Sequence, residues 1–252
     1  MSKVECKVEG AVRHVMLNRA DKRNALDGEM VELIHEAFCV APHAAERVAV
    51  IRAAGPVFCA GLDLREQARE PEGAPAIERM LAAIEVFPLP VVAIVQGDAI
   101  AGGNELALHC DFVVASTAAR FGMSLAQIGM SITWFLTKKL MEVAGPVATR
   151  RILLLGEPLP AAEMHRLGVI SHLAEPTALE ETARAVIDRL AANALLSLET
   201  MKALIVRQMA FRDQIAHADI DVLVDTTRAS EDARVGIAAR LAKRAPTFVG
   251  RS

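Results

Sequence analysis

The chain has 252 residues, of which 53% are hydrophobic and only 4% aromatic. Its net charge of −3 argues against a nucleic-acid backbone as the main partner. The uncharged stretch Val86–Gly97 is too short for a membrane span and contains two prolines, and the N-terminus lacks the apolar segment of an export signal. We therefore expect a cytoplasmic protein with a sizeable core and apolar surface left for partner subunits.

Strands and helices alternate over about the first 190 residues, and helical periodicity alone continues after Ala178 to about Leu241. Asp27 is a good N-cap for the first helix, whose inner side carries apolar residues at helical spacing up to Phe38. The strands that we expect are two within residues 3–18, around the turn at Glu9–Gly10, and then 48–53, 90–95, 112–115 and 169–173. Further helices are expected over 77–84 and 132–143.

Two glycine turns are the candidate site. CAGLDL (59–64) and IAGGNEL (100–106) each follow a strand and open a helix, so each can present a free backbone N–H, from Leu62 and Gly102. If the turns lie side by side, the two N–H groups form a hole for the oxygen of an enolate or a tetrahedral oxyanion. Glu105, directly after the second turn, is placed to move a proton beside that hole.

These turns and several other segments resemble the enoyl-CoA hydratase/isomerase (crotonase) superfamily. FCAGLDL and AGGNELALHCD resemble its two oxyanion-hole segments, LNRADKRNAL its adenine loop, and ARFGMS the strand that returns to the site. The stretch VAGPVATRRILLLGEPLPAAEMHRLGVI resembles the helical region that follows the site. The matches occur in the same order over nearly the whole chain.

The resemblance implies an α/β fold with a crotonase-type ββα spiral core and a C-terminal helical trimerisation region. We expect residues 1–190 to form the core with an acyl-CoA site, and 191–252 to assemble the chain as a homotrimer or a dimer of trimers. The resemblance assigns catalysis to Glu105 and to the amides of Leu62 and Gly102. It assigns substrate binding to Lys22, Arg23, Ala25, Ala60, Asp63, Leu64, Gly103, Leu125 and Trp134. Coenzyme A would be part of the substrate, with no separate cofactor.

The number of carboxylates bears on the reaction. The hydratase branch has a second glutamate where this chain has Leu125, and no Asp or Glu occurs between Arg120 and Glu142. Hydration needs two acid–base groups, whereas a 1,3 proton shift needs one carboxylate that takes a proton and returns it. The sequence therefore favours an isomerase-type step over efficient hydration. An apolar wall of Leu125, Ile132, Trp134 and Phe135 would raise the pKa of Glu105.

Several alternatives stay open. Glu66 could serve as a second acid–base group, or the chain could bind acyl-CoA with weak turnover. Hydrolysis, decarboxylation or carbon–carbon cleavage of a CoA ester also stays possible within the superfamily. His109 shares a helical face with Glu105, but no third ligand at suitable spacing supports a metal site, and a buried histidine is the simpler expectation. The sequence also lacks GxSxG, GxGxxG and P-loop motifs, which disfavours serine hydrolysis and nucleotide cofactors.

Overall fold

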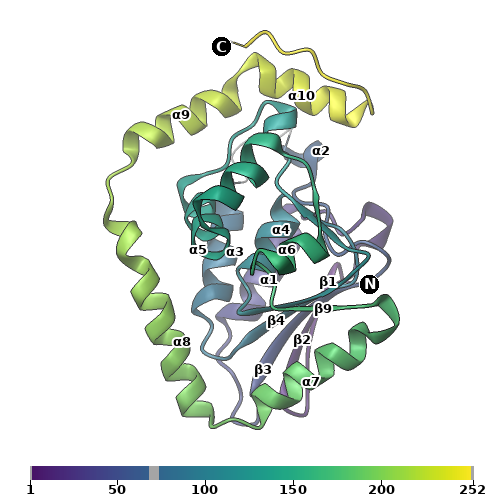
Figure 1. Ribbon diagram of the computed structural model, residues 1–252, viewed down its shortest axis with the longest axis vertical. Coiled ribbons are helices and arrows are strands. Elements are labelled where there is room, and N and C mark those ends of the chain that lie inside the picture. Colours follow the sequence, from purple (N-terminus) through teal and green to yellow (C-terminus); the bar gives the residue numbers. More distant parts are fainter. Residues whose placement is uncertain (1, 68–73, 251–252) are drawn as a thin grey trace.

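The computed structural model describes residues 2–67 and 74–250, which form an α/β fold with a helical C-terminal region (Figure 1). The larger sheet has the strand order β1-β2-β3-β4-β6-β9. Its strands are β1 (Val4–Glu9), β2 (Val12–Leu17), β3 (Val48–Ala53), β4 (Val91–Val95), β6 (Phe112–Ser116) and β9 (His172–Ala174). β1 and β2 are antiparallel, and every later strand runs parallel to its neighbour. The predicted strands within 3–18 and at 48–53, 90–95 and 112–115 are confirmed.

A smaller sheet positions the second glycine turn. It has the order β5-β7-β8, with β5 (Ala99–Ile100) parallel to β7 (Arg120–Gly122) and β8 (Leu159–Pro160) antiparallel to β7. The turn that opens on Ala101 is therefore fixed to the strand within ARFGMS. This pairing brings the stretch that carries Leu125 back to the turn.

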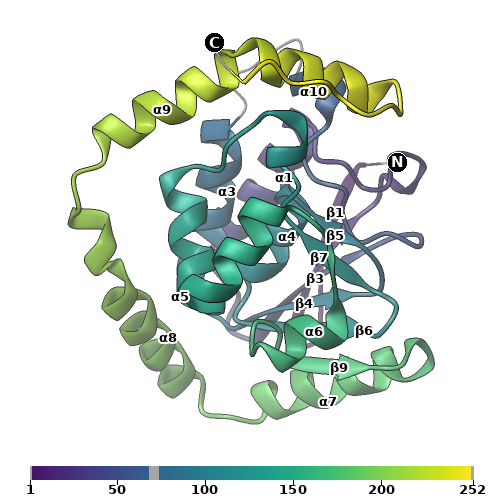
Figure 2. The same cartoon turned by 45° about the horizontal axis from the view of Figure 1, so that its top comes forward.

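The helices pack on both faces of the larger sheet and around its end (Figures 1 and 2). In the core they are α1 (Gly28–Cys39), α2 (Leu64–Gln67), α3 (Ala74–Val86), α4 (Gly102–Leu108), α5 (Trp134–Arg150), α6 (Ala161–Arg166) and α7 (Leu179–Ala191). The C-terminal arm consists of α8 (Leu195–Met209), α9 (Ala218–Ala229) and α10 (Glu231–Leu241). Short turns of helix are Ala20–Lys22, Ala126–Ile128, Arg151–Leu155, Pro176–Ala178 and Ala210–Gln214.

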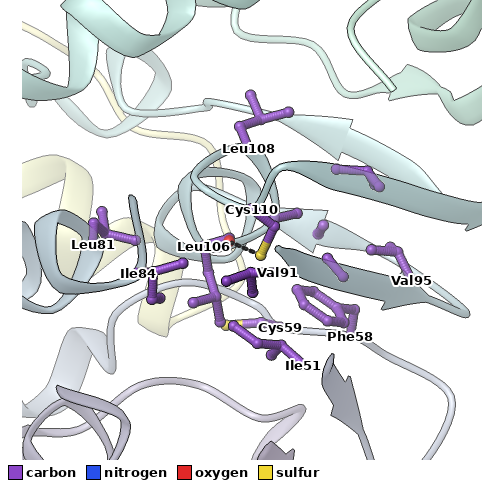
Figure 3. Close-up of a cluster of buried hydrophobic side chains, with 14 of the residues drawn as sticks. Ile51, Phe58, Cys59, Leu81, Ile84, Val91, Val95, Leu106, Leu108 and Cys110 are labelled. Carbon is purple, nitrogen blue, oxygen red and sulfur yellow. Dashed lines mark hydrogen bonds between the residues drawn. The ribbon is translucent and has the colours of Figure 1, made fainter. Parts of the chain in front are cut away.

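Successive side chains of the buried strands point to opposite faces of the sheet, which divides the core into two layers. Ile51, Val91 and Val95 belong to the larger cluster, where they pack with side chains of α3 and α4 such as Leu81 and Leu106 (Figure 3). The intervening side chains of the same strands pack against α7 on the opposite face: Val48, Val50, Val92, Ile94 and Val114. Because both faces are covered, the strands are continuous apolar runs, as expected of a parallel sheet.

Two predicted boundaries differ from the structure. The strand predicted at 169–173 pairs only from His172 onwards, as β9. Val169 is buried but lies in the turn after α6, where its N–H donates to the carbonyl of Met164 at 2.9 Å. Its apolar character reports burial, not strand pairing. The helix predicted at 132–143 begins at Trp134, because Thr133 caps it by accepting from the N–H of Leu136.

The C-terminal arm lies along one side of the core and then arches over its end (Figures 1 and 2). Lys202 attaches α8 to the core through Asp111, with 2.6 Å between Nζ and Oδ2. Large apolar side chains of the arm are nevertheless exposed: Leu196, Met201, Leu204, Ile205, Phe211, Val222 and Leu223. Within residues 2–67 and 74–250, no helix has the length and apolar character needed to cross a bilayer.

Candidate active site

The two glycine turns lie against each other. A Cβ atom at Gly61 would lie 2.9 Å from the carbonyl oxygen of Ile100 and 3.2 Å from the amide nitrogen of Gly102. A Cβ atom at Gly102 would in turn lie 3.5 Å from the amide nitrogen of Leu62. The structure therefore brings together the two amides that the sequence singled out, although about forty residues separate them along the chain.

Neither of these amides has a protein acceptor within the described part of the chain. Gly102 is the first residue of α4, so its N–H has no partner inside the helix. Ala101, which precedes it, has φ 50° and ψ −118°, a conformation that L-residues rarely adopt. Its own N–H donates to the carbonyl of Gly122 at 2.7 Å. That bond helps to hold the strained turn with the Gly102 N–H free.

Gly103 is required for the close approach of the two turns. A Cβ atom at this position would lie 2.2 Å from the carbonyl oxygen of Cys59 and 2.7 Å from its Cβ. No side chain fits there unless the backbone moves. Gly103 therefore sets the separation of the two turns.

A third segment, residues 19–26, supports the first turn. Asn24 is fully buried with a φ of 51°, and its Nδ2 donates to the carbonyls of Ala54 and Val57, both at 2.8 Å. Asn24 was missed in the sequence, although an asparagine in a charged loop is a signal for this left-handed conformation. The carboxylate of the predicted binding residue Asp63 is held here by Arg19, with 2.9 Å between Oδ2 and Nη1.

The remaining predicted residues of this loop lie beside the same turn. The carbonyl of Arg23 accepts from the N–H of Ala60 at 3.1 Å. Ala25 is half-buried, whereas the side chains of Lys22 and Arg23 are exposed and take part in no ion pair within residues 2–67 and 74–250. The two cations are thus available to an external anion.

A cavity of about 100 Å³ opens beside the two amides. Five of the predicted residues line it: Ala60, Leu62, Leu64, Gly102 and Leu125. Its wall is otherwise mostly aliphatic, with Ile77, Ile100, Met123, Ile128, Met130, Ile132 and Leu136. Among the described residues that line it there is no Asp, Glu or His. The cavity is an apolar space with two free N–H groups at one side.

Glu105 lies one helical turn after Gly102 and is completely buried. It does not line the cavity. Its Oε1 accepts from Asn104 Nδ2 at 3.4 Å, while Oε2 has no hydrogen-bond partner among the residues described. Burial raises the pKa of the Glu105 carboxyl to about 8, and the bond from Asn104 and the charge of Lys139 offset only part of that effect. The carboxyl is therefore mostly protonated at neutral pH.

His109 packs beside Glu105 as a neutral buried side chain. Burial lowers its pKa to about 4, so Nδ1 carries the proton that it donates to the carbonyl of Glu105 at 2.8 Å. The ring stacks on Phe135, with 5.3 Å between centroids. No cluster of three or more His, Cys, Asp or Glu suited to a metal ion occurs in the part of the chain that the structure describes.

Two further candidates lie away from the cavity. Both carboxylate oxygens of Glu66 accept from the N–H of Gly28, at 3.1 Å each, so Glu66 stabilises the start of α1. Trp134 stacks on His217 of the C-terminal arm, with 4.8 Å between centroids, and lines a neighbouring cavity of about 430 Å³.

Two arginines that the sequence did not point to also line the small cavity. They are Arg228, in the last turn of α9, and Arg240, in the last turn of α10. Basic residues at helix C-termini are common, because they interact favourably with the helix dipole. More than one hundred residues separate them from the glycine turns, so only the fold reveals their position.

Comparisons with known proteins identify the same relationship over nearly the whole chain. A family model described as enoyl-CoA hydratase/isomerase matches residues 7–251. The (E)-benzylidenesuccinyl-CoA hydratase of Thauera aromatica is 31% identical, with 98% of this chain and 99% of the relative covered. The 2,3-dehydroadipyl-CoA hydratase of Escherichia coli (strain K12) is also 31% identical, over 93% and 94%.

Solved structures agree with the fold. An enoyl-CoA hydratase from Mycobacterium avium subsp. paratuberculosis K-10 superimposes with a TM-score of 0.87 and 27% identity, covering 98% of each chain. A methylmalonyl-CoA decarboxylase bound to 2-nitronate-propionyl-CoA has a TM-score of 0.91 at 23% identity, also over 98% of each chain. The predicted crotonase-type α/β fold with a helical C-terminal region is confirmed.

Proposed function

The chain belongs to the enoyl-CoA hydratase/isomerase family, and from that premise we propose how it acts on an acyl-CoA thioester. The thioester carbonyl oxygen binds between the amides of Leu62 and Gly102, the acyl group enters the apolar cavity, and Glu105 moves a proton next to the carbonyl. Coenzyme A arrives as part of the substrate, with Lys22 and Arg23 beside its phosphates. The reaction needs no separate cofactor.

The observation that carries this proposal is the pair of adjacent, unpartnered amides at the apolar cavity. An enolate oxygen is more negative than a ketone-like carbonyl oxygen, so two fixed donors stabilise the transition state more than the bound substrate. Loss of one such donor costs about 10²–10³ in rate in other enzymes. The strained Ala101 and the close contact at Gly103 hold the donors in place before the ligand binds.

Glu105 is the group that we assign to proton transfer. Its pKa of about 8 is close to a working pH, which favours both giving and taking a proton. The side chain of Glu105 is enclosed and does not line the cavity. Proton transfer therefore requires the wall between Glu105 and the cavity to open when the acyl group binds. Movement of a loop or lid on binding is common in enzymes of this kind of chemistry.

A single carboxylate favours an isomerase-type step. Glu105 takes a proton from one carbon of an enoyl group and returns it to another, while the two amides hold the intermediate dienolate. Leu125, to which the resemblance assigns the position of the second acid of the hydratases, lines the cavity, and Glu66 accepts a hydrogen bond from the amide of Gly28. Loss of one acid–base group costs about 10²–10⁴ in rate, so hydration by this chain would be slow.

The experiment compares two substrates and one variant. The wild-type protein is incubated with a 3-enoyl-CoA and with crotonyl-CoA, and the products are followed by absorbance and mass. We expect the 3-enoyl double bond to move into conjugation, with little addition of water to crotonyl-CoA. Glu105→Gln should abolish that conversion. Full turnover by Glu105→Gln, or rapid hydration of crotonyl-CoA, would contradict the proposed mechanism.

A second function is supported by a specific observation. Since none of the described residues that line the cavity is an acid or a histidine, the protein could serve as an acyl-CoA-binding protein with weak turnover. Tight binding of both esters with no conversion would favour that function. Loss of CO₂, hydrolysis or carbon–carbon cleavage in a wider substrate panel would point to another reaction of the superfamily.

We also propose that the chain assembles as a homotrimer or a dimer of trimers through residues 191–252. The support is the row of exposed apolar side chains on the C-terminal arm, which includes Leu204 and Ile205 on α8 and Val222 and Leu223 on α9. Light scattering after gel filtration measures the assembly. A monomer at micromolar concentration would contradict the assignment.

A further inference from the structure

The C-terminal arm places two cations at the cavity that would receive the acyl group. Arg228 of α9 and Arg240 of α10 line it together with Leu62 and Gly102. Figures 1 and 2 show both helices arching over the end of the core, and in Figure 1 α10 lies above α2. Arg228 is half-buried and Arg240 is exposed, so the guanidinium groups stay partly hydrated at the edge of an apolar space.

No carboxylate of the described protein neutralises these two cations. Within residues 2–67 and 74–250, the lining contains no Asp or Glu, and neither arginine forms an ion pair. Arg240 Nη2 donates only to the neutral Oε1 of Gln127, at 3.3 Å. Arg228 also borders the neighbouring cavity, which is lined by the acids Glu78, Asp213, Asp221 and Asp225, but it forms an ion pair with none of them. Both guanidinium groups are therefore able to donate hydrogen bonds to an anionic ligand.

The size of the cavity limits which anionic ligand can enter it. Its volume is about 100 Å³. An engineered protein cavity of about 150 Å³ holds benzene, so this one has room for a short acyl chain and not for a nucleotide. The phosphates of coenzyme A would stay outside it. An anionic group on the acyl chain itself is small enough to enter.

We propose that the natural substrate is a short acyl-CoA whose acyl group ends in a carboxylate, and that Arg228 and Arg240 are specificity-determining residues for that carboxylate. A guanidinium presents parallel N–H donors that match the two oxygens of a carboxylate, and the apolar wall strengthens the attraction by lowering the local dielectric constant. This inference rests on the proposed function, because the thioester oxygen at Leu62 and Gly102 fixes which way the chain points.

The test compares two esters with the same five-carbon chain. Binding of glutaryl-CoA, pentanoyl-CoA and free coenzyme A is measured by calorimetry at near-neutral pH. Charge-assisted hydrogen bonds predict that the wild-type protein binds glutaryl-CoA about 10- to 100-fold more tightly than pentanoyl-CoA. Arg228→Met and Arg240→Met should lose much of that preference while keeping their affinity for pentanoyl-CoA, which also shows that they fold. Arg228→Lys should keep part of it.

Arg234→Met is the matched control. Arg234 is an exposed residue of α10 that pairs with Glu231 and does not line the cavity, so its replacement should leave both affinities unchanged. Equal binding of the two esters by the wild type would overturn the inference. So would an equal loss for both esters in Arg228→Met and Arg240→Met, which would place the arginines at the coenzyme A phosphates. If neither ester binds more tightly than free coenzyme A, the proposed function fails, and the inference fails with it.

Discussion

Replacement of Glu105 by glutamine should remove a large pH dependence of stability. In the folded chain burial raises the pKa of Glu105 from its ordinary value of 4.5 to about 8. Between these two values the folded state keeps a proton that the unfolded state releases, so the contribution of Glu105 to stability is full below about pH 4.5 and falls as the pH rises towards 8. Above pH 8 both states have lost the proton and the loss is complete.

The size of this pH dependence of stability follows from the shift in the pKa of Glu105. Each pH unit in this window costs about 1.4 kcal/mol, so the wild type should lose about 2.5 kcal/mol between pH 5 and pH 7 through this group alone. Glutamine has a similar shape and does not titrate. The free energy of unfolding of Glu105→Gln, measured by urea titration, should therefore fall less over the same range, and the difference between the two proteins should grow with pH.

Urea titrations at several pH values from 5 to 8.5 test whether Glu105 is protonated in the folded state. Other titrating groups are the same in both proteins, so they cancel in the difference between the two curves. Parallel curves would show that Glu105 is ionised in the folded state at neutral pH, or that it is open to water. Either result would refute the interpretation of a desolvated, protonated carboxyl.

Three further substitutions should test how the site and the fold are held together. Gly103→Ala forces a Cβ atom against the carbonyl of Cys59 and should cost at least about 1–3 kcal/mol in urea unfolding. Arg13→Met removes the guanidinium whose Nε lies 2.8 Å from Oε2 of the fully buried Glu46. This change should lower the free energy of unfolding by about 3–5 kcal/mol. Lys202→Met removes the ion pair that holds α8 and should speed amide hydrogen exchange in α8 without changing exchange in the sheet.

Much of the fold could be predicted because local and global signals coincide. Asp27 was predicted to cap the first helix, and its Oδ1 accepts from the N–H of Met30 at 3.0 Å. The buried strands are continuous apolar runs, which fix their position along the chain to within a residue or two. The exception at Val169 shows the limit of that signal, because an apolar residue is buried equally well in a turn as in a strand.

The sequence predicts the backbone geometry of the candidate site better than it predicts which side chains from distant segments meet there. The glycine turns that present the Leu62 and Gly102 amides follow from residue types that tolerate tight turns. Which side chains cover the cavity depends on how helices are rotated and where the C-terminal arm lies. For that reason neither the stacking of Trp134 on His217 nor the position of Arg228 at the cavity could be predicted from the sequence.

The protonation state of Glu105 also decides which direction of proton transfer comes first. With a pKa of about 8, most molecules hold a protonated carboxyl at neutral pH. A reaction that begins by removing a proton from the substrate needs the ionised form, so its kcat/KM should rise with pH and level off above about 8. A reaction in which Glu105 first donates a proton, for example to an enolate left by loss of CO₂, should instead lose activity above that pH. The isomerase-type step belongs to the first class. A profile that is already flat at pH 6 would show that ligand-free burial does not set the working pKa.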